Sequence, residues 1–284
     1  MKVNPFNIST EYQLMNTPIM IIKADGTREP FNSNKTIQSL SRIGIQGKDA
    51  DRVISKLKKK LYQDITTKKI YDILHSEIRS IQPQTSHKFK LKKALLELGP
   101  AGHYFEDFTA RLLRAEGFKT EVRKKIKGKA VWHEIDVVAE KNKKTYMVEC
   151  KFHNRPGIKC SIQTILYVHA RFLDLKKYNF YKPWLITNTK LSNDVVRYAE
   201  SYGIPVLAWR HPFKNSLEVR IDRTRCYPIT VLPIRRNEKS RLIENGVVSL
   251  LDVPESAEEL STMTGIALNR CRQIIKKYKV TKKK

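Results

Sequence analysis

The most constraining feature of this chain is a pair of apolar stretches, residues 132–139 and 145–153, joined by the short charged segment 140–144. Both stretches are rich in β-branched and aromatic residues, so the sequence predicts two adjacent strands with at least one buried face. Three ionisable residues interrupt them, namely Asp136, Glu149 and Lys151. A charge carried into a core strand is costly unless it is paired or bound to a metal. These three charged residues are therefore expected to pair with one another or to bind a metal ion.

Strand geometry brings the three charges to one place. Glu149 and Lys151 are two residues apart, so both side chains project from the same face of a strand. A hairpin across residues 140–144 places Asp136 alongside Glu149. Carboxylate oxygens suit Mg²⁺, and a neighbouring lysine can orient water or stabilise developing charge. The pattern fits attack of water on a phosphodiester, although spacing alone also fits an ordinary hairpin with a surface Asp and a Glu/Lys pair.

The flanking sequence favours the catalytic interpretation. The segments that carry it are Gly102-His103-Tyr104-Phe105-Glu106, His133-Glu134-Ile135-Asp136, Glu149-Cys150-Lys151-Phe152-His153-Asn154, Leu166–Leu175 and Leu185–Thr189. With these segments, residues 99–210 resemble the PD-(D/E)xK nucleases, and specifically the Mrr-type restriction endonuclease domain. One departure is that Ile135-Asp136 stands where the name of the motif has proline-aspartate.

The resemblance implies roles for five residues. Asp136 and Glu149 would bind Mg²⁺ or Mn²⁺, and Lys151 would be catalytic. Glu106 would support the metal site, and Gln163 would face the catalytic strand from the following helix. For Glu106 a solvated surface position is the alternative, and for Gln163 the alternative is a glutamine on the helix surface.

Composition restricts the partner and the compartment. Lys plus Arg number 55 against 28 for Asp plus Glu, a net charge of +27 with a pI near 9.9, which indicates a polyanion and nucleic acid first. No stretch is long and apolar enough to span a bilayer, and the start lacks the apolar core of a signal peptide, so we expect a cytoplasmic protein without membrane contact. The four cysteines form no Cys-x-x-Cys pair, which argues against a zinc site or a disulfide framework.

The N-terminal part predicts a small hairpin followed by helices. Residues 1–17 form a lead-in, and Ile19–Ile22 and Glu29–Asn32 flank an Asp25-Gly26 turn. Helices are expected over about 33–43, 47–61 and 67–81, with Ser33 and Thr67 as N-caps. The pattern Ile22-Lys23-x-Asp25-Gly26-x-x-Glu29-x-Phe31-Asn32-x-x-Lys35 resembles the ATP-cone, a nucleotide-binding regulatory module.

That second resemblance implies a binding site for ATP or dATP in residues 18–82. Lys23 and Lys35 would neutralise triphosphate oxygens, Glu29 and Asn32 would make nearby polar contacts, and Thr67 would contact the base or sugar. Ala24 departs from a family pattern that often has a second basic residue there. The alternative is a basic hairpin module that has lost nucleotide binding or that binds nucleic acid.

The remaining segments complete an α/β architecture. Residues 83–99 are expected to form a connecting helix, and residues 100–211 the restriction-endonuclease-like core, a sheet with helices on both faces. Residues 212–284 are expected to be a small, basic, α-rich C-terminal region, with strand or extended segments at 217–221 and 227–232. Residues 263–275 resemble the second half of a helix-hairpin-helix, which would bind a DNA phosphate, and a plain packing pair of helices is the alternative.

The function expected from the sequence is that of a metal-dependent DNA endonuclease regulated by nucleotide. One rival is a nucleotide-sensing DNA-binding protein with an inert nuclease centre, and another is an RNA-directed nuclease. A homodimer would supply the two active sites that a double-strand cut in one encounter requires.

Overall fold

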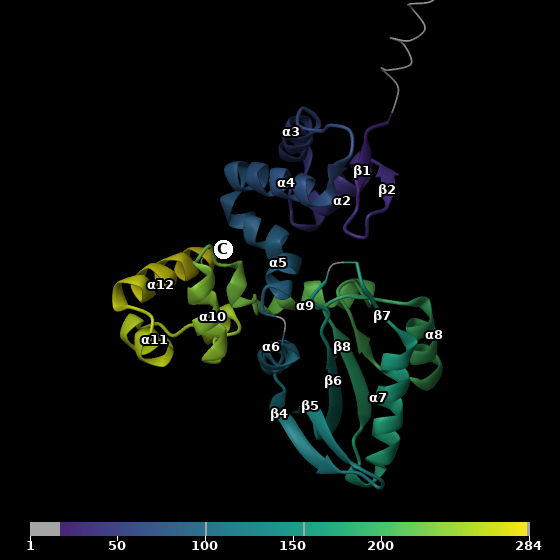
Figure 1. Ribbon diagram of the computed structural model, residues 1–284. Coiled ribbons are helices and arrows are strands. Elements are labelled where there is room, and N and C mark those ends of the chain that lie inside the picture. The colour runs from purple at the N-terminus through teal and green to yellow at the C-terminus, as the bar shows by residue number, and fades with distance from the viewer. Residues whose placement is uncertain (1–17, 100, 156, 283–284) are drawn as a thin grey trace, which may run out of the picture. The chain divides into compact units, whose positions relative to one another are not determined.

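The computed structural model describes residues 18–99, 101–155 and 157–282, and the chain divides into two compact units, one up to Phe89 and one from Lys90 (Figure 1). The predicted lead-in, residues 1–17, lies outside the described residues. No helix in these described ranges combines the length and the apolar character needed to cross a membrane.

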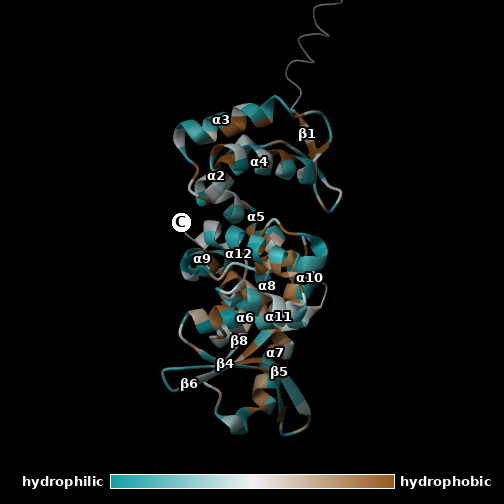
Figure 2. Ribbon diagram, turned by 90° about the vertical axis from the view of Figure 1, so that its left-hand side faces the viewer, coloured by the Kyte–Doolittle hydropathy of each residue, from teal (hydrophilic) through white to brown (hydrophobic). Residues whose placement is uncertain are grey.

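The first unit is a three-stranded sheet covered by helices. Its strands lie in the order β2-β1-β3, with β1 antiparallel to β2 and parallel to β3. Its elements are β1 (Met20–Ile22), β2 (Arg28–Pro30), α2 (Ser33–Arg42), α3 (Gly47–Lys58), β3 (Ile65–Thr66) and α4 (Thr67–Ile81). Each helix places one apolar face in a common core. Hydrophobic and hydrophilic residues can both be seen along α3 (Figure 2).

Both predicted N-caps of the first unit are wrong by one residue. Asn32 caps α2, because its Oδ1 accepts from the backbone N–H groups of Asn34 and Lys35. Thr66 caps α4 by accepting from the N–H of Lys69. The sequence did not predict β3, a strand of only two residues that depends on pairing with β1.

A short 3-10 turn (Pro83–Thr85) leads into the predicted connecting helix, α5 (Ser86–Leu96). Phe89 stacks on Tyr71 with ring centroids 4.8 Å apart and packs against the core of the first unit. Further along the helix, Leu91 and Leu95 are buried in the core of the second unit. The helix therefore contributes apolar side chains to both cores.

The second unit contains a five-stranded mixed sheet in the order β10-β8-β6-β5-β4. Strands β4, β5 and β6 are antiparallel neighbours, whereas β6, β8 and β10 are parallel. The strands are β4 (Lys119–Lys127), β5 (Trp132–Lys141), β6 (Lys144–Lys151), β8 (Lys182–Thr187) and β10 (Val206–Leu207), and a separate pair is formed by β7 (Lys159–Cys160) and β9 (Lys190–Leu191).

Helices cover both faces of this sheet. Met147 packs in a cluster with residues of α7 (Ile162–Asp174) and α8 (Asn193–Tyr202), whereas its neighbour Val148 packs in the cluster that contains α6 (Gly102–Ala115). Alternate residues of a strand point to opposite faces, so α6 covers one face and α7 and α8 cover the other. The predicted α/β core is confirmed.

The C-terminal region is helical, and the prediction of two extended segments there is wrong. Residues 217–221 begin helix α9 (Leu217–Thr224), and 227–232 contain a 3-10 turn (Ile229–Val231). Leu217, Val219 and Ile221 alternate with charged residues, which is typical of a strand, but only Leu217 and Ile221 are buried, one helical turn apart. The other elements are 3-10 turns at Lys176–Tyr178, Phe213–Asn215 and Leu250–Asp252, and helices α10 (Arg236–Glu244), α11 (Ala257–Thr264) and α12 (Leu268–Lys282).

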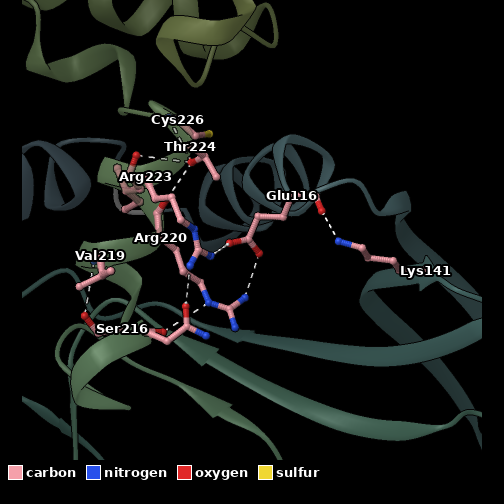
Figure 3. A network of polar contacts seen from close by, with 10 residues as sticks. Glu116, Lys141, Ser216, Val219, Arg220, Arg223, Thr224 and Cys226 are labelled. Carbon is pink, nitrogen blue, oxygen red and sulfur yellow. Dashed lines mark hydrogen bonds and ion pairs between the residues drawn. The ribbon is translucent and has the colours of Figure 1, made fainter. Parts of the chain in front are cut away.

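The C-terminal helices share one apolar core with α5 and α6, and polar contacts reinforce this junction. Glu116, at the end of α6, accepts from Arg220 at 2.9 Å and from Arg223 at 2.8 Å (Figure 3). The Glu116 side chain is only 9% exposed and that of Arg220 15%. Glu116 therefore anchors α9 to α6.

We expect Glu116→Ala to destabilise the protein, because it leaves the largely buried Arg220 without its counter-charge. Breaking a buried ion pair costs about 3 kcal/mol, which corresponds to a Tm roughly 6–12 °C lower in a unit of this size. Thermal unfolding measures this. The control is Glu121→Ala, whose side chain is 63% exposed and pairs with Lys124 three residues away. Equal loss in both variants would contradict the anchoring role.

Candidate functional site

The site is built where β5 and β6 separate. The ladder between them runs from Lys141–Lys144 to Val137–Val148 and ends there. Beyond that pair β6 stays with β8 as far as Lys151, and β5 stays with β4 as far as Trp132. Buried backbone N–H and C=O groups must find partners, so the fork between the two strands has to be closed by side chains.

Two side chains close the fork. The Oδ2 of Asp136 accepts from the N–H of Cys150 at 2.7 Å, on the opposite strand. The Nη1 of Arg171, from helix α7, donates to the carbonyl oxygen of Glu134 at 3.0 Å. The Asp136 carboxylate is thereby fixed next to β6, directly opposite the position of Glu149.

Arg171 also fixes Glu149. Its Nη1 forms an ion pair with Oε2 of Glu149, its Nη2 donates to the hydroxyl of Tyr167, and its side chain is only 9% exposed. Lys151 lies two residues further on β6 and is exposed. The structure thus brings Asp136, Glu149 and Lys151 to one end of the sheet, as the sequence predicts.

The carboxyl groups of the site disfavour one another's ionised forms. Burial raises the pKa of Glu149 to about 7, and the negative charge of Asp136 adds to the effect. Burial also raises the pKa of Asp136, although the Cys150 N–H and Arg171 act in the opposite direction. The pKa of Glu106 is raised by burial and then by Asp136. Additional positive charge would therefore stabilise the ionised site.

Glu106 reaches this cluster from helix α6 together with an arginine of β4. Arg123 lies in the left-handed region (φ 52°) opposite Asp136, where the β4–β5 ladder skips one pair. It donates to Glu106 at 3.3 Å and to Asp107 at 2.8 Å. The side chain of Glu106 is 16% exposed, so the alternative of a solvated surface position does not hold.

A further polar residue extends the end of β6. Asn188 is buried and uses its amide both to accept from the N–H of His153 and to donate to its carbonyl oxygen, each at 2.9 Å. These two bonds continue the β6–β8 pairing past Lys151. Burial, and then Lys151, lower the pKa of His153. The backbone that follows Lys151 is therefore held in place.

The donor set fits a hard divalent cation without forming a closed cage. Within residues 18–99, 101–155 and 157–282, no three His, Cys, Asp or Glu side chains are arranged so that they could hold a metal ion. Asp136 and Glu149 are two carboxylates from adjoining strands whose charges repel. A cation that prefers oxygen ligands and keeps several waters, as Mg²⁺ does, needs only one or two protein carboxylates.

The predicted nucleotide site lies on the first unit. Glu29 forms ion pairs with both Lys23 (2.9 Å) and Lys35 (3.0 Å). These contacts raise the pKa of Lys23 and lower that of Glu29. The parallel ladder between β1 and β3 ends at the pair Ile22–Thr66, just before Lys23 on one segment and just before Thr67, the first residue of α4, on the other. Asn32 belongs to the same region, but its side-chain oxygen caps α2.

Comparisons with known proteins agree with this architecture. Family profiles described as ATP cone domain, restriction endonuclease and AF1548-like C-terminal match residues 19–96, 100–211 and 227–280. An uncharacterized protein from Archaeoglobus fulgidus is 39% identical over 170 residues, 60% of this chain and 97% of that protein. A crystal structure described as AF1548, a protein of unknown function, superposes with a TM-score of 0.57 at 37% identity, covering 63% of this chain and 97% of the other.

The chain belongs to the AF1548-like family. Within that family it carries an N-terminal ATP cone and a restriction endonuclease domain of the Mrr type, which confirms both resemblances.

Two predictions about this AF1548-like chain remain untested. Gln163 is exposed near the start of α7, on the helix face that carries Tyr167 and Arg171 one and two turns later. The described residues include no hydrogen-bond partner for it, so its role at the site stays a prediction. In the C-terminal region, α11 and α12 are joined by three residues that include Gly265 at φ 63°. Phosphate binding there also stays a prediction.

Three further residues shape the site, and the sequence did not predict their contacts. They are Arg123, Arg171 and Asn188. The spacing Tyr167–Arg171, one helical turn, was the only sequence signal that these side chains share a face.

We predict that burial of the Glu149 carboxyl group, together with the negative charge of Asp136, limits stability in the absence of metal. The pKa of Glu149 lies above its ordinary value, so its contribution to stability is complete below pH about 4.5 and is lost as the pH rises through about 7. Without metal, the Tm of Glu149→Gln minus the Tm of the parent should therefore be larger at pH 8 than at pH 4.5. Glu140→Gln, an exposed change on β5, should show no such trend. A parent and Glu149→Gln pair whose Tm difference is constant from pH 4.5 to 8 would contradict the account.

Proposed function

We propose that this AF1548-like protein is a metal-dependent endonuclease that hydrolyses DNA phosphodiester bonds. The observation that carries the proposal is the convergence of Asp136, Glu149 and Lys151 at the fork between β5 and β6. Its restriction endonuclease domain and its net charge of +27 support a DNA substrate.

The roles of the residues follow from their positions. Asp136 and Glu149 would hold Mg²⁺ or Mn²⁺, and such an ion, when bound, polarises a phosphoryl oxygen and lowers the pKa of a coordinated water. Lys151 is exposed at the end of β6, where its ammonium group can orient water and stabilise negative charge at phosphorus. Arg171 is a positioning residue, because it holds Glu149 and closes the fork at Glu134. Glu106 and Gln163 would be secondary.

The intact set of three favours catalysis over an inert nuclease centre. A silent site has no chemical need for two buried, mutually repelling carboxylates, whose ionisation is unfavourable without a cation. An RNA-directed nuclease would use the same phosphate chemistry, so substrate comparison must separate it from a DNA enzyme.

We expect Asp136→Ala and Lys151→Ala to reduce Mg²⁺-dependent nicking of supercoiled plasmid at least about a hundredfold, as loss of one group acting on the transition state does in other enzymes. Agarose-gel assays of nicking on plasmid, branched DNA and RNA measure this. Glu140→Ala removes an exposed carboxylate from the same strand and should cleave like the parent. Cleavage by either site variant at the parental rate would refute the site, and preferential cleavage of RNA would favour the RNA-directed alternative.

The ATP cone supports regulation by ATP or dATP. In the first unit, Glu29 occupies both lysines that the triphosphate would need. Phosphate oxygens carry more charge than one carboxylate and can displace it from Lys23 and Lys35. Thr67, the first residue of α4, would contact the base or sugar, and Asn32 would act mainly by fixing the start of α2.

We expect Lys23→Ala and Lys35→Ala each to weaken ATP or dATP binding about tenfold or more, the size of a lost charge-assisted hydrogen bond. Isothermal titration calorimetry on the full chain measures this. Lys48→Ala, an exposed lysine at the start of α3, should bind nucleotide like the parent. Unchanged affinity in both site variants would contradict the assignment of these two lysines to the triphosphate.

The C-terminal region would add DNA contacts. The sequence of residues 268–282, which form α12, contains six Lys and Arg residues and no Asp or Glu. Asn269, Arg272, Gln273 and Lys276 lie exposed at helical spacing on one face. Arg241 donates to the carbonyl oxygen of Gly265, which ties the α11–α12 turn to α10. Two copies of the chain would provide the two active sites for a double-strand cut.

A further inference from the structure

The tip of the β4–β5 hairpin exposes large apolar side chains. Trp132 is 68% exposed and Val131 57%, whereas the other two tryptophans, Trp184 and Trp209, are 6% and 3% exposed. A tryptophan that lies mostly in water is unfavourable for an isolated chain. It is often a binding residue, because its ring presents a large rigid surface.

Trp132 shares its face of the hairpin with basic side chains. Its partner across the strands is Lys127, and Glu134 is opposite Lys125. Side chains of such pairs lie on the same face, with Cβ atoms about 5 Å apart. On the other face, His133 contacts Asp174 of α7, and Ile135 is buried beside α7. Lys129 is exposed in the turn. Among Trp132, Lys125, Lys127, Lys129 and Glu134, only Glu134 is acidic.

The tip is held rigidly without using Trp132. Asp174 accepts from the N–H of Lys129 at 3.0 Å through its backbone oxygen and from the N–H of Ala130 at 2.9 Å through its carboxylate. Its carboxylate also lies 2.7 Å from His133 Nε2. Gly128 makes this close approach possible, since a Cβ there would lie 1.8 Å from Asp174. The indole is therefore presented at little entropic cost on binding.

We propose that Trp132, with Lys125, Lys127 and Lys129, forms a DNA contact in which the indole stacks on an accessible base. The three lysines complement the phosphates that flank such a base, and stacking needs an unpaired or frayed nucleotide. Trp132 is four residues from Asp136 on β5, about 13 Å along the strand. The contact therefore selects DNA with unpaired bases a few nucleotides from the cut. This inference rests on the proposed function, because it assigns the substrate class of that site.

Binding of fluorescein-labelled DNA to the full chain in EDTA tests the contact without cleavage. We expect Trp132→Ala to weaken binding of single-stranded or forked DNA about fivefold or more, with a smaller effect on continuous duplex. Trp132→Phe should restore most of the affinity. Phe213→Ala removes a side chain that is 82% exposed on the 3-10 turn Phe213–Asn215 and should bind like the parent.

Tryptophan fluorescence gives a second readout. DNA should quench the parent's emission and protect it from iodide, and Trp132→Phe should lose that response, because the remaining tryptophans are buried. Equal DNA affinity in Trp132→Ala and the parent would overturn the proposal. So would a shift in sedimentation from dimer to monomer without loss of affinity, which would assign the tip to contact between copies. Neither assay needs DNA cleavage. If the parent protein does not cleave DNA, the proposed nuclease activity is refuted, whereas the proposed DNA contact is still tested by these two assays.

Discussion

The interruption of pairing between β5 and β6 is the constraint on which the site depends. In a hairpin paired along its whole length, the N–H of Cys150 and the carbonyl oxygen of Glu134 would form hydrogen bonds with the backbone of the opposite strand. Because it opens after Val137–Val148, the Asp136 carboxylate takes the N–H of Cys150 and the Arg171 guanidinium takes the carbonyl of Glu134. The hydrogen bonds that satisfy these backbone groups therefore also hold an aspartate and an arginine beside Glu149.

Charge balance explains why basic residues surround the carboxylates. Burial raises the pKa values of Asp136, Glu149 and Glu106, and the negative charge of Asp136 raises those of Glu149 and Glu106 further. Arg171 from α7 and Arg123 from β4 supply positive charge from two sides, and helix α6 contributes Glu106 and Asp107. Helices α6 and α7, which cover opposite faces of the sheet, thus both contribute charged groups to the site. The protein positions the carboxylates, and their raised pKa values mean that additional positive charge would favour the ionised site.

The sequence predicted the elements that have a periodic residue pattern. It did not predict the features that depend on contacts between segments far apart in the chain. Alternation and turn signals located the hairpin of β5 and β6. The spacing of Asp136, Glu149 and Lys151, together with the flanking segments, predicted a site there. Period-two alternation misled at Leu217–Ile221, where burial selects a helix. β3 exists through pairing with β1. Arg123, Arg171 and Asn188 act through partners 16 to 37 residues away, which local pattern cannot specify.

The central claim is that Asp136 and Glu149 together bind one divalent cation at the fork. Electron paramagnetic resonance of Mn²⁺ titrated into the full chain without DNA measures this directly, because bound Mn²⁺ loses the sharp signal of the free ion. The account predicts a site in the parent and in Glu140→Ala that is lost in Asp136→Ala and in Glu149→Ala. Mn²⁺ binding that is identical in all four proteins would contradict it.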